Sequence, residues 1–153
     1  MNDYKVEEDF KYNRLRCVIA LMSTGHRCGY VGITKDHPLY GKDYNTNCSE
    51  LLKSKIDGES IGERGIIPLL LMDDSGYVSP DCYFNVHGGI TYAGGGDNSK
   101  YPVESDLWWF GFDCAHCDDL NDYNAALKYG IMTQEHYDYS TQMEREYPTH
   151  GII

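Results

Sequence analysis

Short runs of apolar and β-branched residues, separated by turn-forming residues, dominate the first part of the chain. The runs Arg16 to Met22 and Arg27 to Ile33 are each long enough for one strand. Between them stands Ser23-Thr24-Gly25-His26, which is typical of a turn, so the two runs are predicted to pair as a β-hairpin. The second run contains Gly29 and Gly32, which indicate a bulge or a close approach of another group to the backbone.

Three later runs are also predicted to be strands. Ile66 to Met72 is apolar, but Pro68 restricts it to an edge strand or to the start of a strand. Asn85 to Ala93 has strand character and is broken by Gly88-Gly89. Leu107 to Asp119 begins with LWWFGF and ends in ionisable and thiol groups. It is therefore predicted to be a buried strand that carries a polar cluster to the rim of the core.

The remaining segments predict the N-terminal structure and the helices. Met1 to Tyr12 is polar and acidic, so we expect a loose lead-in or a short first element. Asn47 to Ile56, Asn121 to Tyr129 and Thr133 to Tyr147 have helical character, and Thr133 is suited to cap the last of them. Because most strands are sequence neighbours joined by short turns, the pattern predicts an α+β fold. Its sheet is expected to be mostly antiparallel, with about five strands and two to three helices.

Length and charge narrow the class of protein. The 153 residues fit a single domain, predicted to span residues 1–153. The formal net charge of −11 disfavours extended nucleic acid and anionic membranes as partners, because both need a basic surface. It does not exclude a small anion held by a few cations and N–H groups. The 14 tyrosines suit half-buried and ligand-facing surfaces, and the sequence leaves a homo-oligomer open.

The N-terminal segment Met1 to Phe10 is charged and has no apolar region of a secretory signal. No apolar run reaches the length of a transmembrane helix. We therefore expect a cytoplasmic protein whose cysteines are reduced.

The first stretch that carries chemistry is His87-Gly88-Gly89 with Thr91. Two glycines after a histidine let the backbone approach a bound group and direct N–H groups at it. His87 suits a general base, a hydrogen-bonding ligand contact or a metal ligand, and Thr91 would share its side of a regular strand. The alternative is a β-bulge that contains a structural histidine.

The second stretch runs from Asp113 to Asp119. Asp113 and His116 are predicted to act together, because a carboxylate can orient an imidazole and raise its basicity. Cys114 and Cys117 form a C-x-x-C, but a zinc site needs two further ligands and no second pair has the right spacing. We therefore predict no metal and no other cofactor. The alternative is a polar strand end whose aspartate caps the following turn.

A third group of residues offers cations and further polar contacts. Arg27 and Lys35 could hold a phosphate or carboxylate, and His37 and Tyr40 lie in a turn-rich segment that could contact a ligand. The alternative is a solvated loop and hairpin end. The residues predicted to bind a ligand are Gly88, Gly89, Thr91, Trp108, Trp109, Arg27, Lys35, His37 and Tyr40, beside the catalytic candidates His87, His116 and Asp113.

Three sequence blocks resemble a widespread family of small uncharacterised proteins encoded by phages and prophages. The blocks are GHRCGYVGITKDHPLYGKDY, NVHGGITYAG and LWWFGFDCAHCDD. The resemblance implies that eight of the candidate residues lie in the family's signature blocks: His87, Gly88, Gly89, Thr91, Trp108, Trp109, Asp113 and His116. It also implies an accessory role in the infected cell's cytoplasm, where phage proteins of this size often bind or destroy a nucleotide signal of host defence.

Two functions from different classes follow. In the first, an aromatic wall stacks a nucleotide-type ligand while the histidines contact its polar part, either for capture or for His-dependent hydrolysis by a phosphodiesterase. The chain carries no Walker loop, G-x-S-x-G elbow, H-E-x-x-H or dinucleotide fingerprint, so hydrolysis would not use those machineries. In the second, an acidic surface mimics an acidic partner or blocks a basic host protein, and both motif stretches are core. Two features discriminate between the functions: the burial of His87 and His116, and whether both point into a cavity that solvent can reach.

Overall fold

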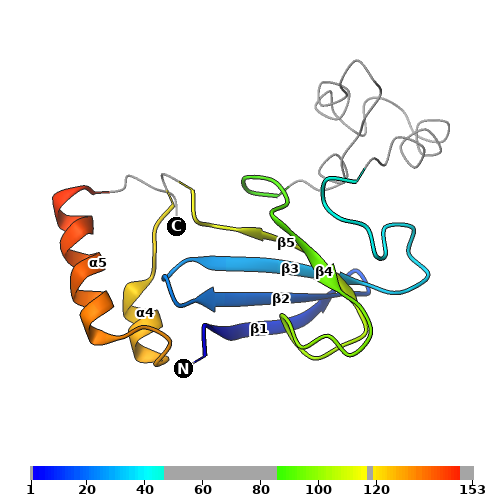
Figure 1. The fold of residues 1–153 in the computed structure, drawn as a ribbon, viewed down its shortest axis with the longest axis horizontal. Helices are drawn as coiled ribbons and strands as arrows, with labels where there is room; N and C mark the ends of the chain where they lie inside the picture. The colour runs from blue at the N-terminus through cyan, green and yellow to red at the C-terminus, as the bar shows by residue number, and fades with distance from the viewer. Residues whose placement is uncertain (1, 47–85, 117–118, 149–153) are drawn as a thin grey trace, which may run out of the picture.

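The computed structural model describes residues 2–46, 86–116 and 119–148. Within these residues the chain forms five strands and two helices (Figure 1). The strands are β1 (Tyr4–Tyr12), β2 (Leu15–Met22), β3 (Arg27–Ile33), β4 (Tyr92–Gly95) and β5 (Trp108–Asp113). The helices are α4 (Tyr123–Lys128) and α5 (Gln134–Glu146).

The five strands form one sheet in the order β1-β2-β3-β5-β4, and every neighbouring pair is antiparallel. The predicted α+β class with a mostly antiparallel sheet of about five strands is confirmed. The predicted helix at residues 47–56 and the predicted strand at residues 66–72 lie outside the described residues.

The predicted hairpin is present as β2 and β3. β3 has the predicted bounds, and β2 begins one residue before the predicted run. The turn between them is closed by the Met22 N–H, which donates to the His26 carbonyl at 2.9 Å, and Gly25 takes a φ of +89°. That left-handed conformation suits glycine, so the turn residues fix the register of the pair.

The N-terminal segment differs from the prediction. It is the nine-residue edge strand β1, which pairs with β2 along its whole length. Its side chains are mostly exposed, so its sequence lacks the apolar alternation that marks a half-buried strand. Backbone pairing, the packing of Tyr4 and Val6 against the core and ion pairs such as that of Asp9 with Arg16 hold it. The register shifts between Val6 and Glu8, which makes Glu7 the extra residue of a β-bulge.

The predicted strand at Asn85 to Ala93 is wrong over most of its described part. β4 begins only at Tyr92, and His87 and Gly88 form a turn before it. Gly88 and Gly89 have φ values of +70° and +85°, which are left-handed conformations and cannot continue a strand. His87 and Thr91 are therefore not placed on one side by strand alternation.

The glycines of β3 allow aromatic rings of β5 to lie on the backbone. Gly29 is paired with Phe112 and Gly32 with Trp109. A Cβ at Gly29 would lie 2.5 Å from a Phe112 ring atom, and one at Gly32 would lie 3.0 Å from the Trp109 ring. Of the two alternatives for these glycines, the close approach of another group is the one observed.

The sheet buries apolar residues on both faces. One face carries a cluster of five buried residues: Val18, Ala20, Cys28, Tyr30 and Trp109. Three further tyrosines, Tyr4, Tyr92 and Tyr101, join it through edge-to-face contacts that include Tyr30. The other face packs against the segments that precede β4 and follow β3, and its buried residues are Ile33, Leu39, Ile90 and Phe110. β5 contributes to both faces, so it lies at the centre of the core.

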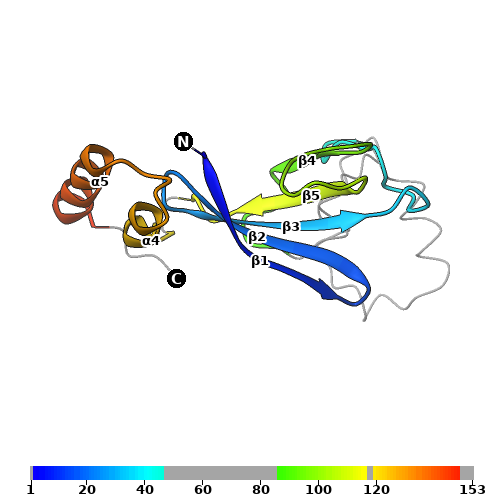
Figure 2. The same cartoon turned by 90° about the horizontal axis from the view of Figure 1, so that it is seen from below.

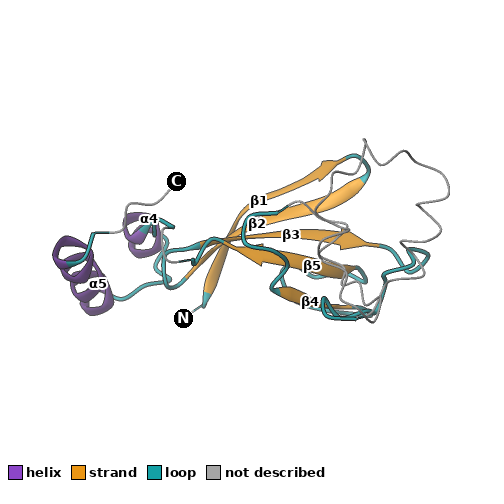
Figure 3. Cartoon of the chain, turned by 90° about the horizontal axis from the view of Figure 1, so that it is seen from above, coloured by secondary structure: helices purple, strands orange, loops and turns teal. Residues whose placement is uncertain are grey.

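The two helices stand beside one end of the sheet rather than over a face (Figures 2 and 3). α4 packs through Ala126 against Leu21, where β2 ends. Thr133 caps α5 by accepting a hydrogen bond from the His136 N–H, as predicted, and α5 buries none of its residues. No helix in the described ranges has the length and apolar character needed to span a bilayer.

Candidate functional site

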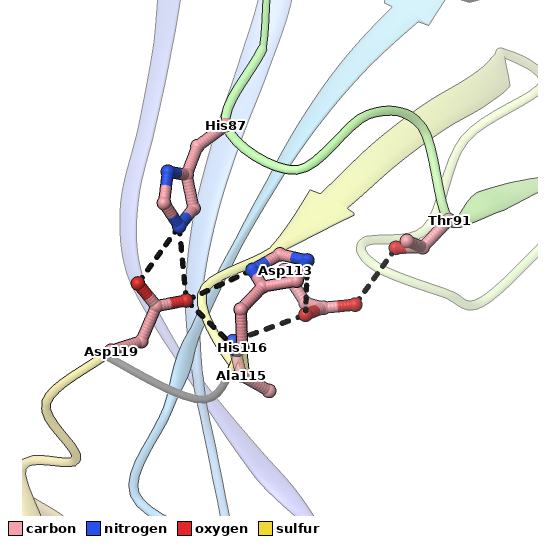
Figure 4. A network of polar contacts seen from close by, with 6 residues as sticks. All are labelled: His87, Thr91, Asp113, Ala115, His116 and Asp119. Carbon is pink, nitrogen blue, oxygen red and sulfur yellow. Dashed lines mark hydrogen bonds and ion pairs between the residues drawn. The ribbon is translucent and has the colours of Figure 1, made fainter. Parts of the chain in front are cut away.

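The pairing of β4 with β5 brings the two motif stretches together. The strands are antiparallel, so residues that precede β4 lie beside residues that follow β5. The Thr91 N–H donates to the Gly111 carbonyl at 2.9 Å, and the Thr91 hydroxyl donates to Asp113 Oδ2 at 2.9 Å (Figure 4). The turn that carries His87 is thereby fixed next to the chain that leaves β5.

Asp119 joins the two histidines. His87 Nε2 lies 2.8 Å from Asp119 Oδ1 and 3.0 Å from Oδ2. His116 Nδ1 lies 2.9 Å from Asp119 Oδ2, and the His116 backbone N–H donates to the same oxygen at 2.9 Å. One carboxylate therefore orients two imidazoles, and we call these three residues the His-Asp-His cluster (Figure 4).

Asp119 is held as a carboxylate. Its residue is 7% exposed, whereas the side chains of His87 and His116 are 49% and 39% exposed. The hydrogen bond from the His116 backbone N–H lowers its pKa most, and the two imidazoles lower it further, to about 2. Burial acts in the opposite direction and is outweighed. At neutral pH the cluster therefore contains a charged acceptor beneath two exposed rings.

Each histidine keeps a second ring nitrogen for chemistry. When His87 Nε2–H and His116 Nδ1–H both donate to Asp119, His87 Nδ1 and His116 Nε2 are the remaining nitrogens. The two ring centroids are 5.0 Å apart and the rings are nearly perpendicular. Two oriented imidazoles at this spacing can act on one bound group as a general base and a general acid.

Gly88 makes room for His116. A Cβ at Gly88 would lie 2.1 Å from His116 Cε1 and 2.2 Å from Nε2, a separation that real atoms do not adopt. Its φ of +70° also favours glycine. The glycine pair after His87 therefore serves the approach of the second histidine.

Asp113 lies beside His116, as predicted, but Asp119 makes the shorter contacts. His116 Nε2 is 3.9 Å from Asp113 Oδ1, within ion-pair range but too far for a hydrogen bond, whereas its Nδ1 is 2.9 Å from Asp119 Oδ2. Asp113 accepts from Thr91 and from the Ala115 N–H, as an aspartate that closes a turn does. Asp119 was not among the predicted site residues, because two adjacent acidic residues, Asp118 and Asp119, are typical of a solvated surface.

The predicted aromatic wall belongs to the core. Trp109 is fully buried, and its indole N–H donates to Ser105 Oγ at 3.1 Å, so it presents no surface to a ligand. Trp108 is partly buried and donates to the Lys42 carbonyl at 2.9 Å, with Tyr40 tilted against it. The tryptophans position β5 and do not line the His-Asp-His cluster.

The other predicted ligand contacts have different partners. Arg27 makes a bidentate ion pair with Glu7 and a further one with Asp122, and the Glu7 hydrogen bond raises its pKa most. Lys35 pairs with Asp97. The structure gives His37 a hydrogen bond from the Leu39 N–H, and gives the Tyr40 hydroxyl one to the Asp106 carbonyl.

The donor atoms of the His-Asp-His cluster are close enough to share one ion. One ligand atom each from His87, His116 and Asp119 lies within 4.8 Å of the others. The C-x-x-C contributes nothing that can be described here, because Cys117 lies outside the described residues. Burial, as the largest cause, raises the pKa of the Cys114 thiol, which keeps it protonated and weakly nucleophilic.

Comparisons with protein-family models, with curated protein sequences and with solved structures found no match. The resemblance to small phage proteins stays a prediction from the sequence. The function is therefore inferred from the geometry of the site.

Proposed function

We propose that this protein is a phage-type accessory factor that binds a small nucleotide-type ligand at the His-Asp-His cluster and hydrolyses its phosphate ester. The observation that carries the proposal is one buried carboxylate orienting two exposed imidazoles. Burial of both rings without access would instead favour the acidic protein-binding module. Their side chains are 49% and 39% exposed, which supports a ligand that reaches them.

The roles of the two histidines follow from their second nitrogens. His87 Nδ1 accepts a proton from the attacking water, while Asp119 stabilises the imidazolium that forms through Nε2–H. His116, in its imidazolium form with Nδ1–H on Asp119, donates a proton from Nε2 to the leaving oxygen and becomes neutral. The carboxylate of Asp113, 3.9 Å from that nitrogen, puts a negative charge beside the proton to be transferred. Proton transfer of this kind contributes typically about 10²–10⁴-fold to a rate.

The ligand class and the cellular role come from the phage resemblance. A nucleotide signal of host defence is a small anion, which the net charge of −11 allows only where local groups compensate it. We therefore propose action in the host cytoplasm as an anti-defence factor. The acidic exterior argues against extended nucleic acid as the substrate.

A thermal-shift screen of the full chain against cyclic and linear nucleotides, followed by chromatography of each hit, tests the proposal. We expect one nucleotide class to raise the melting temperature and to yield a hydrolysed product. His87→Ala and His116→Ala should each lower the hydrolysis rate by about 10²-fold or more. The matched control is His136→Ala, an exposed histidine on α5, which should leave both readouts unchanged.

The outcomes separate the alternatives. A thermal shift without any product would replace hydrolysis by capture of the signal. No shift and no product with any nucleotide would contradict the proposal and leave the protein-binding module as the better account.

A further inference from the structure

Among residues 2–46, 86–116 and 119–148, the charges identified so far do not explain how the His-Asp-His cluster of an acidic protein would hold a phosphate. The two cations predicted for that task are paired with carboxylates, Arg27 with Glu7 and Asp122, and Lys35 with Asp97. Within the cluster, Asp119 brings a negative charge. A phosphate at this position therefore needs a further source of positive charge.

We infer that His87 Nε2, His116 Nδ1 and the Asp119 carboxylate together bind one divalent transition-metal ion, with zinc as the best match. All three donors face one another, and the ligand atoms lie within 4.8 Å. In the ion-free arrangement the two N–H groups donate to the carboxylate at 2.8 and 2.9 Å. A metal ion would take the place of these two protons.

The distances require only a small opening of the cluster. Zinc binds imidazole nitrogen and carboxylate oxygen at about 2.0–2.2 Å, so neighbouring donors in a tetrahedral site lie about 3.4 Å apart. The nitrogen–oxygen distances of 2.8 to 3.0 Å would widen by about half an ångström. His87 sits in a turn and His116 in the segment after β5, and both side chains are part-exposed, so neither ring is locked by core packing.

The donor set selects the kind of ion. Two imidazole nitrogens and one carboxylate suit Zn²⁺, Co²⁺, Ni²⁺ or Fe²⁺, whereas Mg²⁺ and Ca²⁺ prefer oxygen ligands. Three protein ligands with exposed rings leave a coordination position for water or for a ligand, as in catalytic rather than structural zinc sites. An ion of charge +2 would outweigh the single charge of Asp119.

Asp113 gains a role in this arrangement. If His116 binds the ion through Nδ1, its Nε2 carries a proton and points toward Asp113 Oδ1, 3.9 Å away. A carboxylate that accepts from the far nitrogen of a ligating histidine is the usual outer partner at such sites. Thr91 donates to the other oxygen of Asp113 and holds it in place.

The metal ion changes one step of the proposed function, the activation of the attacking water, and only this step rests on the proposed function. With the ion present, the attacking water would be activated by the metal, and His87 would be a ligand in place of the general base. Binding of the ion itself does not depend on whether the ligand is a nucleotide. The two ideas can therefore fail separately.

The full chain is first treated with chelator, and the chelator is then removed. Titration of this metal-free protein with Co²⁺, followed by absorption, and with Zn²⁺, followed by calorimetry, tests the site. We expect one ion per chain, with a cobalt spectrum that lacks the strong near-ultraviolet band of thiolate ligation. His87→Ala and His116→Ala should each weaken binding by at least about 100-fold. The control His136→Ala should bind like the wild type. Thermal unfolding of each variant shows whether it is folded.

Several results would overturn the inference. These are absence of binding by the wild type at micromolar ion, unchanged affinity in folded His87→Ala, and a thiolate band that assigns the ion to cysteines. Nucleotide hydrolysis that persists at full rate in chelator would contradict the metal site and leave the proposed function intact. Metal binding with no response to any nucleotide would support the metal site and contradict the proposed nucleotide ligand.

Discussion

Two ionic clusters lie near the same end of the sheet, and they are built in opposite ways. In one, the cation Arg27 at the start of β3 lies between the carboxylates of Glu7 and Asp122. In the other, the anion Asp119 lies between two imidazoles. Only two residues separate Asp119 from Asp122, so one short segment supplies an acid to each cluster.

The two clusters differ in which hydrogen-bonding groups they leave free of contacts within the cluster. The guanidinium of Arg27 directs three hydrogen bonds at two carboxylates, and these tie the β1 bulge and the N-cap of α4 to β3. Such a cluster joins elements of the fold. In the His-Asp-His cluster, each imidazole uses one nitrogen to contact Asp119 and retains the other. That cluster therefore keeps one nitrogen of each part-exposed ring outside the contact with Asp119, which the proposed function requires.

The largest effect is expected from removing the core of the sheet. Trp109→Ala should lower the free energy of unfolding by about 3–5 kcal/mol, because the indole is fully buried between β3 and the loop before β5. His116→Ala removes a part-exposed ring and should cost much less stability while it abolishes ligand handling. Urea unfolding of both variants measures the difference. A larger stability loss for His116→Ala would mean that the cluster holds the fold.

Gly88→Ala should disable the His-Asp-His cluster without unfolding the protein. The new Cβ would displace the His116 ring, and the left-handed φ adds a strain of about 1 kcal/mol. Gly130→Ala is the matched control, since Gly130 also has a φ of +70° but has nothing within 4 Å of its Cβ position. Both variants should lose similar stability in urea, and only Gly88→Ala should lose ion or nucleotide binding. Equal binding in the two would show that the approach of His116 is not critical.

Arg27→Met should affect stability alone. Its side chain is 39% exposed, so solvent screening reduces the value of its ion pairs to about 1 kcal/mol in total. The variant breaks the cluster that joins β1, β3 and α4, and it leaves the histidines in place. Nucleotide and ion binding should match the wild type when measured well below the melting temperature. A parallel loss of binding would show that the two clusters are coupled through residues 119–122.

The smallest effect concerns acid stability. Folding lowers the pKa of Asp119 from its ordinary value of 3.8 to about 2. The carboxylate therefore makes its full contribution to stability at pH values above 3.8. It is lost as the pH falls from about 4 to about 2, because protonation then favours the unfolded chain. Asp119→Asn should flatten this part of a plot of urea midpoint against pH. An unchanged slope would show that the carboxylate is not stabilised by its N–H donors.

Much of the fold could be predicted from the sequence because its signals are local. The β2–β3 hairpin follows from two apolar runs around a Gly-containing turn, and the start of α5 follows from Thr133. β1 could not be predicted in the same way. Its pairing uses backbone groups, which every residue has, and its exposed side chains carry no strand pattern.

The sequence by itself determined which residue types the site contains and that two stretches carry them: His87-Gly88 in one, and Asp113, His116 and Asp119 in the other. Only the tertiary structure decided which carboxylate serves the histidines, because all aspartates offer the same atoms. The choice depends on the antiparallel pairing of β4 with β5 and on the path of the chain after it, which brings Asp119 back to His116 and His87. For the same reason, only the fold showed that Trp109 lies in the core and that Arg27 forms ion pairs with Glu7 and Asp122.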